Sequence, residues 1–317
     1  MPNDFTDKGF ILPCTNEDIQ NTPDKRGMRE NSAKKQGRRH NNSSALSHID
    51  STSACKPFLK WPGGKRWLVE NYKHLLPTAI KGRYIEPFLG GGAVFFALQP
   101  KEALLSDLCD DLIAVYRGIR NQPSQVARFL ESHAVSHNTE YYYRIRDEEP
   151  RLIAERAARI LYLNRACFNG IYRVNRQGKF NVPIGTRQNI LRNDDFNKLS
   201  RVLGQSTIKL SDFEPIIEDA RKGDFVFVDP PYTVKHNSNG FIKYNEILFS
   251  WDDQRRLHDC LVKARSRGVS ILMTNANHYS VRELYKKGFT QTVVSRFSSI
   301  AASSGDRDRY EELVIQC

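Results

Sequence analysis

The sequence has few cysteines and no long apolar run, and each shortage excludes a class of protein. Its six cysteines are scattered over 317 residues without a Cys-x-x-Cys pair, which argues against a disulfide framework and a zinc knuckle. No apolar stretch approaches the roughly 20 residues that cross a bilayer, and the N-terminus lacks the basic-then-apolar order of a signal peptide. We therefore expect a cytoplasmic protein without a membrane segment, whose thiols are free and mostly buried.

Metal-ligand patterns are also absent from the sequence. The eight histidines show no His-Glu-x-x-His or similar spacing, so no metal site is predicted. We interpret four of them as structural or surface groups: His74, His236, His258 and His278. What the chain does have is a formal net charge of +12. Excess positive charge favours polyanionic partners, although ribosome-binding and membrane-surface proteins share it.

Residues 1–55 are rich in Asn, Ser, Asp, Lys and Arg and show no helical or strand period. This composition is typical of a solvated, disordered tail. The basic stretch at residues 34–39, Lys-Lys-Gln-Gly-Arg-Arg, leaves a contact with DNA phosphate open as the alternative. Order is expected to begin at Pro57.

The rest of the chain alternates short apolar strands with helices. A helix is predicted at Trp251–Arg267, where Ser250 and Asp253 make a capping-box pattern. Alternation of this kind predicts an α/β fold with a mostly parallel sheet and sites at the carboxyl ends of its strands. The predicted strands are Tyr84–Pro87, Ala103–Ser106, Phe225–Val228, Ser270–Thr274, Phe289–Val294 and Leu313–Ile315.

Residues 117–211 break the alternation. Helices are predicted there around Ser124–His133 and Arg151–Leu163, followed by a basic, loop-rich stretch. We interpret this part as an insert in an α/β domain that comprises residues 56–116 and 212–317.

A glycine run joins the first strand to a helix that starts near Ala93, in the sequence Glu86-Pro-Phe-Leu-Gly-Gly-Gly92. Glycine lets a ligand approach the backbone, and a helix N-terminus supplies N–H donors. Asp107 ends the next strand, where a carboxylate can accept the ribose hydroxyls of a nucleoside. The run is not Gly-x-Gly-x-x-Gly, so a nucleoside site and a tight structural turn both stay open at this point.

A second motif, Asp229-Pro230-Pro231-Tyr232, follows the apolar strand Phe225–Val228. The carboxylate lies where open α/β sheets bind substrates, and the prolines stiffen the turn and leave carbonyl oxygens without a competing N–H. The aromatic ring can stack on a planar group. Together these residues suit a flat base with an exocyclic amine, while a merely rigid turn is the alternative.

These motifs, in this order, resemble the Dam-type (D12 class) DNA adenine-N6 methyltransferases across residues 57–317. The stretch from Lys60 to Leu68 resembles the family's first motif, and the stretch from Ser106 to Ile113 its ribose-binding segment; Cys109 stands where the family often has Asn. The resemblance implies a Rossmann-like methyltransferase fold, a helical target-recognition insert and S-adenosylmethionine as cofactor. The cofactor-binding residues that it implies are Trp61, Lys65, Glu86, Pro87, Phe88, Gly90, Gly92, Asp107 and Asp229.

The stretch from Asn164 to Gly185 closely resembles the family's DNA-contacting hairpin. Residues 164–190 carry five basic residues and no acidic one, with aromatic residues between them, which suits a duplex; a solvated basic loop is the alternative. By resemblance, Arg173 reads a guanine edge, and Phe168 lies beside the gap left by the target adenine. The implied DNA-binding residues are Phe168, Asn169, Ile171, Arg173, Asn175, Lys179 and Pro183. Arg296 or Arg307 would touch phosphate.

The expected reaction is direct methyl transfer to adenine N6 in double-stranded DNA, with Asp229, Pro230, Pro231 and Tyr232 as catalytic residues. The target base must leave the stack, at a cost of a few kcal/mol. No metal is needed, and no cysteine lies in the Pro-Cys context of the cytosine-C5 enzymes. Cytosine N4, RNA adenine and protein glutamine remain alternative acceptors, and a DNA-binding protein without turnover is the alternative from another class.

The resemblance favours GATC as the recognised sequence. We expect a monomer, associated with a bacterial or phage nucleoid. Whether it serves a restriction pair, a phage, another mobile element or a housekeeping system stays open, as does the role of the tail.

Overall fold

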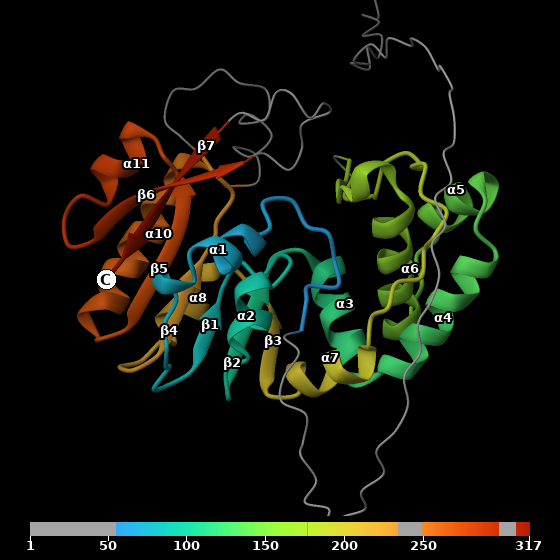
Figure 1. The fold of residues 1–317 in the computed structure, drawn as a ribbon, viewed down its shortest axis with the longest axis horizontal. Coiled ribbons are helices and arrows are strands. Elements are labelled where there is room, and N and C mark those ends of the chain that lie inside the picture. The colour runs from blue at the N-terminus through green and yellow to red at the C-terminus, as the bar shows by residue number, and fades with distance from the viewer. Residues whose placement is uncertain (1–54, 176, 234–248, 298–308) are drawn as a thin grey trace, which may run out of the picture. The chain divides into compact units, whose positions relative to one another are not determined.

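The computed structural model describes residues 55–175, 177–233, 249–297 and 309–317. Their strands form a mixed sheet in the order β3-β2-β1-β4-β5-β7-β6 (Figure 1). Strands β3, β2, β1, β4 and β5 are parallel neighbours, and β7 runs antiparallel between β5 and β6. The strands are β1 Tyr84–Glu86, β2 Ala103–Asp107, β3 Ser206–Leu210, β4 Phe225–Val228, β5 Ser270–Ala276, β6 Thr290–Phe297 and β7 Arg309–Gln316.

Helices cover both faces of this sheet, because its central strands are apolar on both sides. In β4, Phe225 and Phe227 belong to one core cluster, and Val226 and Val228 belong to the other. Helices α1 (Arg66–Asn71), α2 (Ala93–Leu98) and α3 (Asp110–Asn121) pack on the first face. Helices α8 (Phe213–Glu218), α10 (Trp251–Ser266) and α11 (Tyr279–Leu284) pack on the second. The predicted α/β fold is thus confirmed as a three-layer arrangement.

Most of the predicted elements appear within a residue or two of their expected bounds. Helix α10 begins with the predicted capping box, in which Ser250 and Asp253 bond each other's backbone N–H. Leu257, Leu261 and Ala264 on its apolar face are fully buried. The strand that follows Asp224 matches its prediction from Phe225 to Val228.

The predicted insert, residues 117–211, includes two elements that pack with the sheet region. Strand β3 pairs in parallel with β2, and α7 (Phe196–Leu203) packs against α3. Both lie inside the range 117–211, so the sheet region resumes well before residue 212. The prediction missed β3 because it is an edge strand, Ser-Thr-Ile-Lys-Leu, whose residues are mostly exposed, and it therefore lacks an apolar run.

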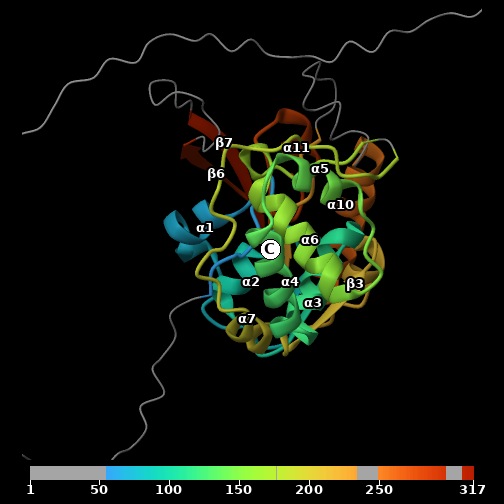
Figure 2. The same ribbon diagram turned by 90° about the vertical axis from the view of Figure 1, so that its right-hand side faces the viewer.

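The helical part of the insert is built around α6 (Ile153–Ala166), of which eleven of fourteen residues are buried. It packs against α3 and against α4 (Pro123–Val135), and Figure 2 looks onto α4 and α6. A Cβ at Gly118 of α3 would lie 2.6 Å from the Cβ of Ala157 in α6, so the two helices approach closely. The same apolar cluster continues from α6 into the sheet. The remaining short elements are η1 Lys73–Leu75, α5 Thr139–Asp147 and η2 Phe168–Gly170.

Within the described ranges, no helix is long and apolar enough to cross a membrane. The tail to residue 54, the basic stretch at 34–39, His236 and Arg307 lie outside the described residues, as does the side chain of Arg296.

Candidate active site and nucleic-acid interface

The two predicted motifs lie at one edge of the sheet. The chain runs outward from β1 to β3 and then returns to β4, so the strand order reverses between β1 and β4. Open α/β sheets bind ligands at such a point, outside the carboxyl ends of the strands. The glycine run follows β1, and Asp229 follows β4.

The glycine run forms a tight loop beside Trp61 and Tyr116. Gly90 and Gly92 have φ angles of 46° and 62°. A Cβ would lie 2.7 Å from the Tyr116 hydroxyl oxygen at Gly92, and 3.0 Å from Trp61 Cδ1 at Gly90. The loop therefore requires glycine for both conformation and space. The Tyr116 hydroxyl donates to the Gly90 carbonyl at 3.1 Å, which ties the loop to α3.

Asp107 lies at the end of β2 and holds this loop from the other side. Its Oδ2 accepts from the Gly90 N–H, and its Oδ1 from the Cys109 N–H, both at 3.0 Å. Burial raises the pKa of the Asp107 carboxyl, and these hydrogen bonds oppose that rise. Cys109 makes this contact through its backbone N–H, which nearly any residue supplies. The contact with Asp107 is therefore kept although Cys109 stands where the family often has Asn. Burial raises the pKa of its thiol to about 11.

Asp229 is held through a single carboxylate oxygen. Its Oδ1 accepts from the Lys65 ammonium at 2.8 Å and from the Thr274 hydroxyl at 2.7 Å. Lys65 and Thr274 are buried. Among the described residues no partner is recorded for Oδ2, and the Asp229 side chain is 19% exposed. The carboxylate is therefore fixed in orientation with one oxygen left for a substrate.

Lys65 also donates to the Gly63 carbonyl at 2.6 Å and lies 3.8 Å from Glu312 Oε2. Its ammonium thus lies among protein acceptors and beside Asp229, although the resemblance implied a cofactor contact. Burial raises the pKa of the Asp229 carboxyl, while the Lys65 charge opposes that rise.

The Tyr232 hydroxyl donates to Glu312 Oε2, and its ring centroid lies 5.1 Å from Lys65 Nζ. Burial raises the pKa of this phenol well above its usual value. Sequence reasoning missed Glu312 and Thr274 at this site. Glu312 precedes the predicted strand Leu313–Ile315, and an acidic residue directly before an apolar run was the only signal that could have identified it.

The side chains around the glycine run are engaged in the protein interior. Glu86 is 2% exposed and accepts from the Tyr84 hydroxyl at 2.9 Å. Pro87 is buried, and the Phe88 ring stacks on Phe213 with centroids 5.4 Å apart. Burial raises the pKa of Glu86 well above its usual value, and repulsion from the Asp229 and Asp107 carboxylates adds to the rise.

Four carboxylates therefore lie in this corner: Glu86, Asp107, Asp229 and Glu312. Lys65 is the cation that the described residues place among them. A site with this balance of charge stabilises a bound cation, because a positive group relieves both the desolvation and the mutual repulsion of the carboxylates.

An aromatic stack joins this corner to the predicted DNA-contacting part. Trp61 lies on Tyr172 with ring centroids 4.8 Å apart and planes 24° apart. The Tyr172 hydroxyl donates to Asp111 Oδ2 at 3.0 Å. The Asn164 side chain in turn bonds the backbone N–H and carbonyl of Lys60.

Residues 164–190, called the recognition segment below, fold back on themselves through antiparallel bridges between Cys167 and Ile184 and between Val174 and Phe180. Phe168 and Ile171 are 52% and 38% exposed, and Asn169 adopts a positive φ of 54°. The implied DNA-binding residues are exposed: Phe168, Asn169, Ile171, Arg173, Asn175, Lys179 and Pro183.

Within this segment the polar side chains mainly bond their neighbours. Arg173 donates to the Asn181 side chain at 2.9 Å, and Asn175 Oδ1 accepts from the N–H groups of Gln177 and Lys179. Lys179 lies 3.5 Å from Glu149, and both side chains are exposed. Exposed pairs of this kind contribute little, so these groups remain available to a partner.

Arg165 differs from the other basic residues of the segment. It is 2% exposed, donates to Asp194 at 2.6 Å and to the Ile190 carbonyl, and its Nε has no partner. Burial lowers its pKa to about 10. The sequence argument counted Arg165 among the charges that suit a duplex, and the structure assigns it an internal role.

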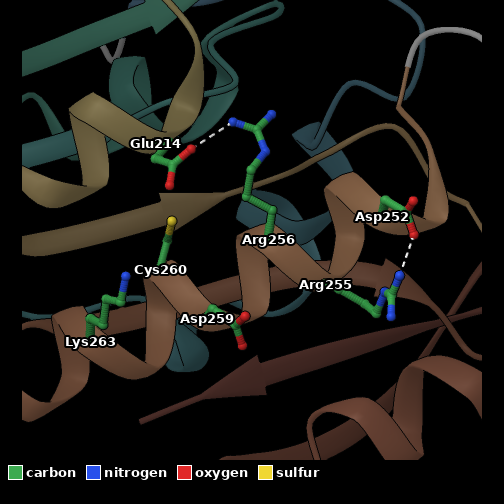
Figure 3. Close-up of a pocket in the computed structure, with 7 residues that line it drawn as sticks. All are labelled: Glu214, Asp252, Arg255, Arg256, Asp259, Cys260 and Lys263. Carbon is green, nitrogen blue, oxygen red and sulfur yellow. Dashed lines mark hydrogen bonds and ion pairs between the residues drawn. The ribbon is translucent and has the colours of Figure 1, made fainter.

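None of the predicted site residues lines the surface hollow between α8 and α10 (Figure 3). It is lined by Glu214, Asp252, Arg255, Arg256, Asp259, Cys260 and Lys263. Four of its charged side chains are paired within the protein: Arg256 bonds Asp212, Glu214 and Asp253, and Arg255 pairs with Asp252 (Figure 3). Mixed charge that is largely paired in this way does not point to a substrate site.

The fold and this corner define an enzyme of the Rossmann-like methyltransferase class, with a glycine loop after β1, a carboxylate at the end of β2 and Asp-Pro-Pro-Tyr after β4. A sequence model of the D12 class N6 adenine-specific DNA methyltransferases matches residues 61–300. The chain belongs to this family.

Named relatives agree with this assignment. The type II methyltransferase M1.LlaDCHI of Lactococcus lactis subsp. cremoris is 37% identical over 82% of this chain and 94% of its own length. The type II methyltransferase M.MjaIII of Methanocaldococcus jannaschii is 32% identical over 82% of this chain and 98% of its own. The DNA adenine methylase of Vibrio cholerae is 31% identical, with coverage of 82% and 95%. The predicted enzyme class is thereby confirmed, and membership implies a methyl donor of the S-adenosylmethionine type.

Proposed function

We propose that this protein methylates adenine N6 in double-stranded DNA at GATC, with S-adenosylmethionine as the donor bound beside the glycine loop. The observation that carries the proposal is the arrangement of Asp229. Lys65 and Thr274 both bond its Oδ1, which leaves Oδ2 to accept an exocyclic amine. The rigid Asp-Pro-Pro-Tyr turn supplies a second acceptor, the Pro230 carbonyl, and an aromatic ring at Tyr232.

The residues of the corner fit such a donor. Gly90 and Gly92 leave no Cβ between the loop and Trp61 or Tyr116, and the Asp107 carboxylate already orders the Gly90 backbone beside it. When bound, S-adenosylmethionine supplies an electrophilic methyl group on a positively charged sulfur. The excess of carboxylates in the corner stabilises that charge. Trp61, Lys65 and the backbone of residues 86–92 complete the proposed cofactor site.

The chain's own groups orient the amine. Adenine N6 is a weak nucleophile because its lone pair is delocalised into the ring. Hydrogen bonds from its two N–H groups to Asp229 and Pro230 favour a pyramidal nitrogen whose lone pair points away from the ring. As the N–CH₃ bond forms, the bond between that methyl group and the donor's sulfur breaks, and its electron pair stays on the sulfur, which leaves as a neutral thioether. Positive charge then develops on N6 and the Asp229 carboxylate stabilises it, so positioning and electrostatics carry the catalysis. The surplus proton on N6 is released to solvent.

The recognition segment supplies the proposed DNA contacts. Two kinds of exposed side chain suit this role: Arg173 and Lys179 suit base edges and phosphate, and Phe168 and Ile171 are apolar groups at a turn. Such groups can fill the space of a base that has left the stack. We therefore assign target recognition to the helical insert with this segment, and chemistry to the sheet region. Since one chain carries both, we propose a monomer that acts on DNA in the cytoplasm.

The experiment that tests the proposal is expression in a host without adenine methylation, followed by mapping of N6-methyladenine in its genome. Methylation confined to GATC is the expected result. Methylation at another sequence would keep the reaction and overturn the recognition of GATC. Absence of methylated adenine would contradict the proposed substrate, and the purified protein would then be offered RNA, cytosine-containing DNA and protein with labelled S-adenosylmethionine.

A further inference from the structure

Glu312 is a charged side chain in a strand whose next residues are apolar. It is 3% exposed, and Leu313, Val314 and Ile315, which follow it in β7, are fully buried. Burying a carboxylate is costly unless charge or hydrogen bonds compensate it. Glu312 opposes Ala276 of β5 and Val294 of β6 in the sheet, so its backbone position is set by pairing on both sides.

The carboxylate faces the Asp-Pro-Pro-Tyr turn. Glu312 Oε2 accepts the Tyr232 hydroxyl hydrogen and lies 3.8 Å from Lys65 Nζ. On its other side, Lys65 Nζ lies 2.8 Å from Asp229 Oδ1. The groups alternate in sign, from Glu312 to Lys65 to Asp229. The contact of Glu312 with Tyr232 is shorter than its contact with Lys65.

This contact determines how freely the Tyr232 ring can move. Pro231 restricts the backbone on one side of the tyrosine, and the bond to Glu312 fixes the far end of the ring. A tyrosine held at both ends keeps the position and direction of its ring, and a base stacked on that ring keeps its N6 in line with the methyl group. Misplacement of about 1 Å is enough to slow such a reaction about 100-fold.

We propose that Glu312 is a positioning residue for methyl transfer that acts through the Tyr232 hydroxyl and contacts neither the base nor the donor. The inference rests on the proposed function, since Tyr232 is taken to stack on the target base. A purely structural Glu312 would instead stabilise β7 and affect folding without a specific effect on turnover.

A double-mutant cycle separates these roles. The variants are Glu312→Leu, Tyr232→Phe and the double variant, with Glu311→Leu as the matched control, because Glu311 is the neighbouring exposed residue of the same strand. Each is assayed with labelled S-adenosylmethionine on plasmid DNA from a host without adenine methylation. Melting temperature and the Kd for the donor are measured alongside, so that a folding defect is recognised.

Glu312→Leu should lower kcat about 10- to 100-fold, the effect expected for a lost hydrogen bond to a charged group, with KM for DNA little changed. In the Tyr232→Phe background the same substitution should cost less than about 3-fold, because the hydroxyl on which it acts is already gone. Glu312→Gln keeps an acceptor for the hydroxyl and should recover part of the loss. Glu311→Leu should turn over like the wild type.

Losses that multiply in the double variant would overturn the inference, as would wild-type kcat in Glu312→Leu. A fall in melting temperature with unchanged kcat would show a structural role and overturn it as well. Failure of the proposed function has a different signature: the wild-type protein itself would transfer no label to DNA, and both proposals would then fall together.

Discussion

The catalytic corner and the recognition segment differ in where their polar side chains find partners. Around Asp229, the side chains of Lys65, Thr274 and Glu312 are buried: Lys65 and Thr274 bond the Asp229 carboxylate, and Glu312 lies beside Lys65. They come from the residue before α1, from β5 and from β7, so the contacts join distant parts of the chain. In the recognition segment, Arg173 and Lys179 are exposed and pair only with near neighbours or with an exposed acid. The polar groups of the corner are thus already oriented by contacts within the protein. The hydrogen-bond donors of the segment are exposed and can bind a partner.

The difference predicts that substitutions in the two regions damage different steps. A change in the corner should slow methyl transfer while DNA binding persists. A change in the segment should alter which DNA is bound while the chemistry on that DNA persists. The predictions below test this division, from the largest expected effect to the smallest.

Asp229→Ala should lower kcat by about 10³-fold or more, because the oriented carboxylate that accepts the amine is lost. The Kd for duplex DNA should change by less than about 3-fold, since the recognition segment is untouched. Single-turnover methylation and fluorescence anisotropy measure the two quantities. Near-normal turnover in this variant would contradict the assignment of methyl transfer to the corner around Asp229.

Arg173→Ala should reduce discrimination against altered target sequences by about 1–3 kcal/mol, the value of one bidentate contact to a base. Its matched control is Lys179→Ala in the same segment, which should weaken binding to all sequences alike and lower the salt dependence by about one unit. Competition binding with a panel of duplexes that each carry one altered base pair reports both. Equal loss on all sequences for Arg173→Ala would place its contact on phosphate.

Lys65→Met should move the acid limb of the kcat profile to higher pH. Burial raises the pKa of Asp229 and the Lys65 charge opposes that rise, so removal of the ammonium raises the pKa further. Since the ionised carboxylate is the active form, activity at a given acidic pH falls. Steady-state kcat at saturating donor and DNA, from pH 5 to 9, is the measurement. Lys286→Met, an exposed lysine paired with Glu283, should keep the wild-type profile.

Glu86→Gln should raise the free energy of unfolding near neutral pH by about 1 kcal/mol or more. Burial raises the pKa of Glu86 well above its usual value, so its folded pKa exceeds its unfolded pKa and ionisation disfavours the folded state as pH rises. The gain should therefore shrink as pH falls and the glutamate becomes neutral. Urea unfolding at pH 5 and pH 8 measures it, with the exposed Glu70→Gln as control. A gain independent of pH would contradict this account.

Local patterns made the sheet and its two motifs predictable. The apolar run Phe225–Val228 and the glycines at 90–92 are contiguous in sequence and carry their own signals. The capping box at Ser250 and Asp253 is likewise a matter of three-residue spacing. What the sequence lacked was information on partners far apart in the chain. Thr274 and Glu312 reach Asp229 and Tyr232 only because β5 lies beside β4 in the sheet and β7 lies beside β5.

Exposure was the other quantity that composition did not reveal. Arg165 and Arg173 are eight residues apart in a segment without acids, and they look alike in the sequence. Arg165 is on the last turn of α6 and is buried against Asp194, whereas Arg173 follows the turn at Gly170 and is exposed. The two arginines differ because Arg165 lies on the face of α6 that points into the protein. The sequence argument did not establish which face of this helix is buried.

The apolar cluster that runs from the sheet through α3 into α6 bears on how this enzyme would acquire a new target sequence. An exchange of the whole insert with that of a relative would cut through a shared interior, where Gly118 and Ala157 meet at a distance that only glycine permits. The insert to which we assign DNA recognition is therefore not an independent unit that can be exchanged whole. New specificity is accessible instead at the exposed rim of the recognition segment, where single side chains can change without disturbing the interior beneath them.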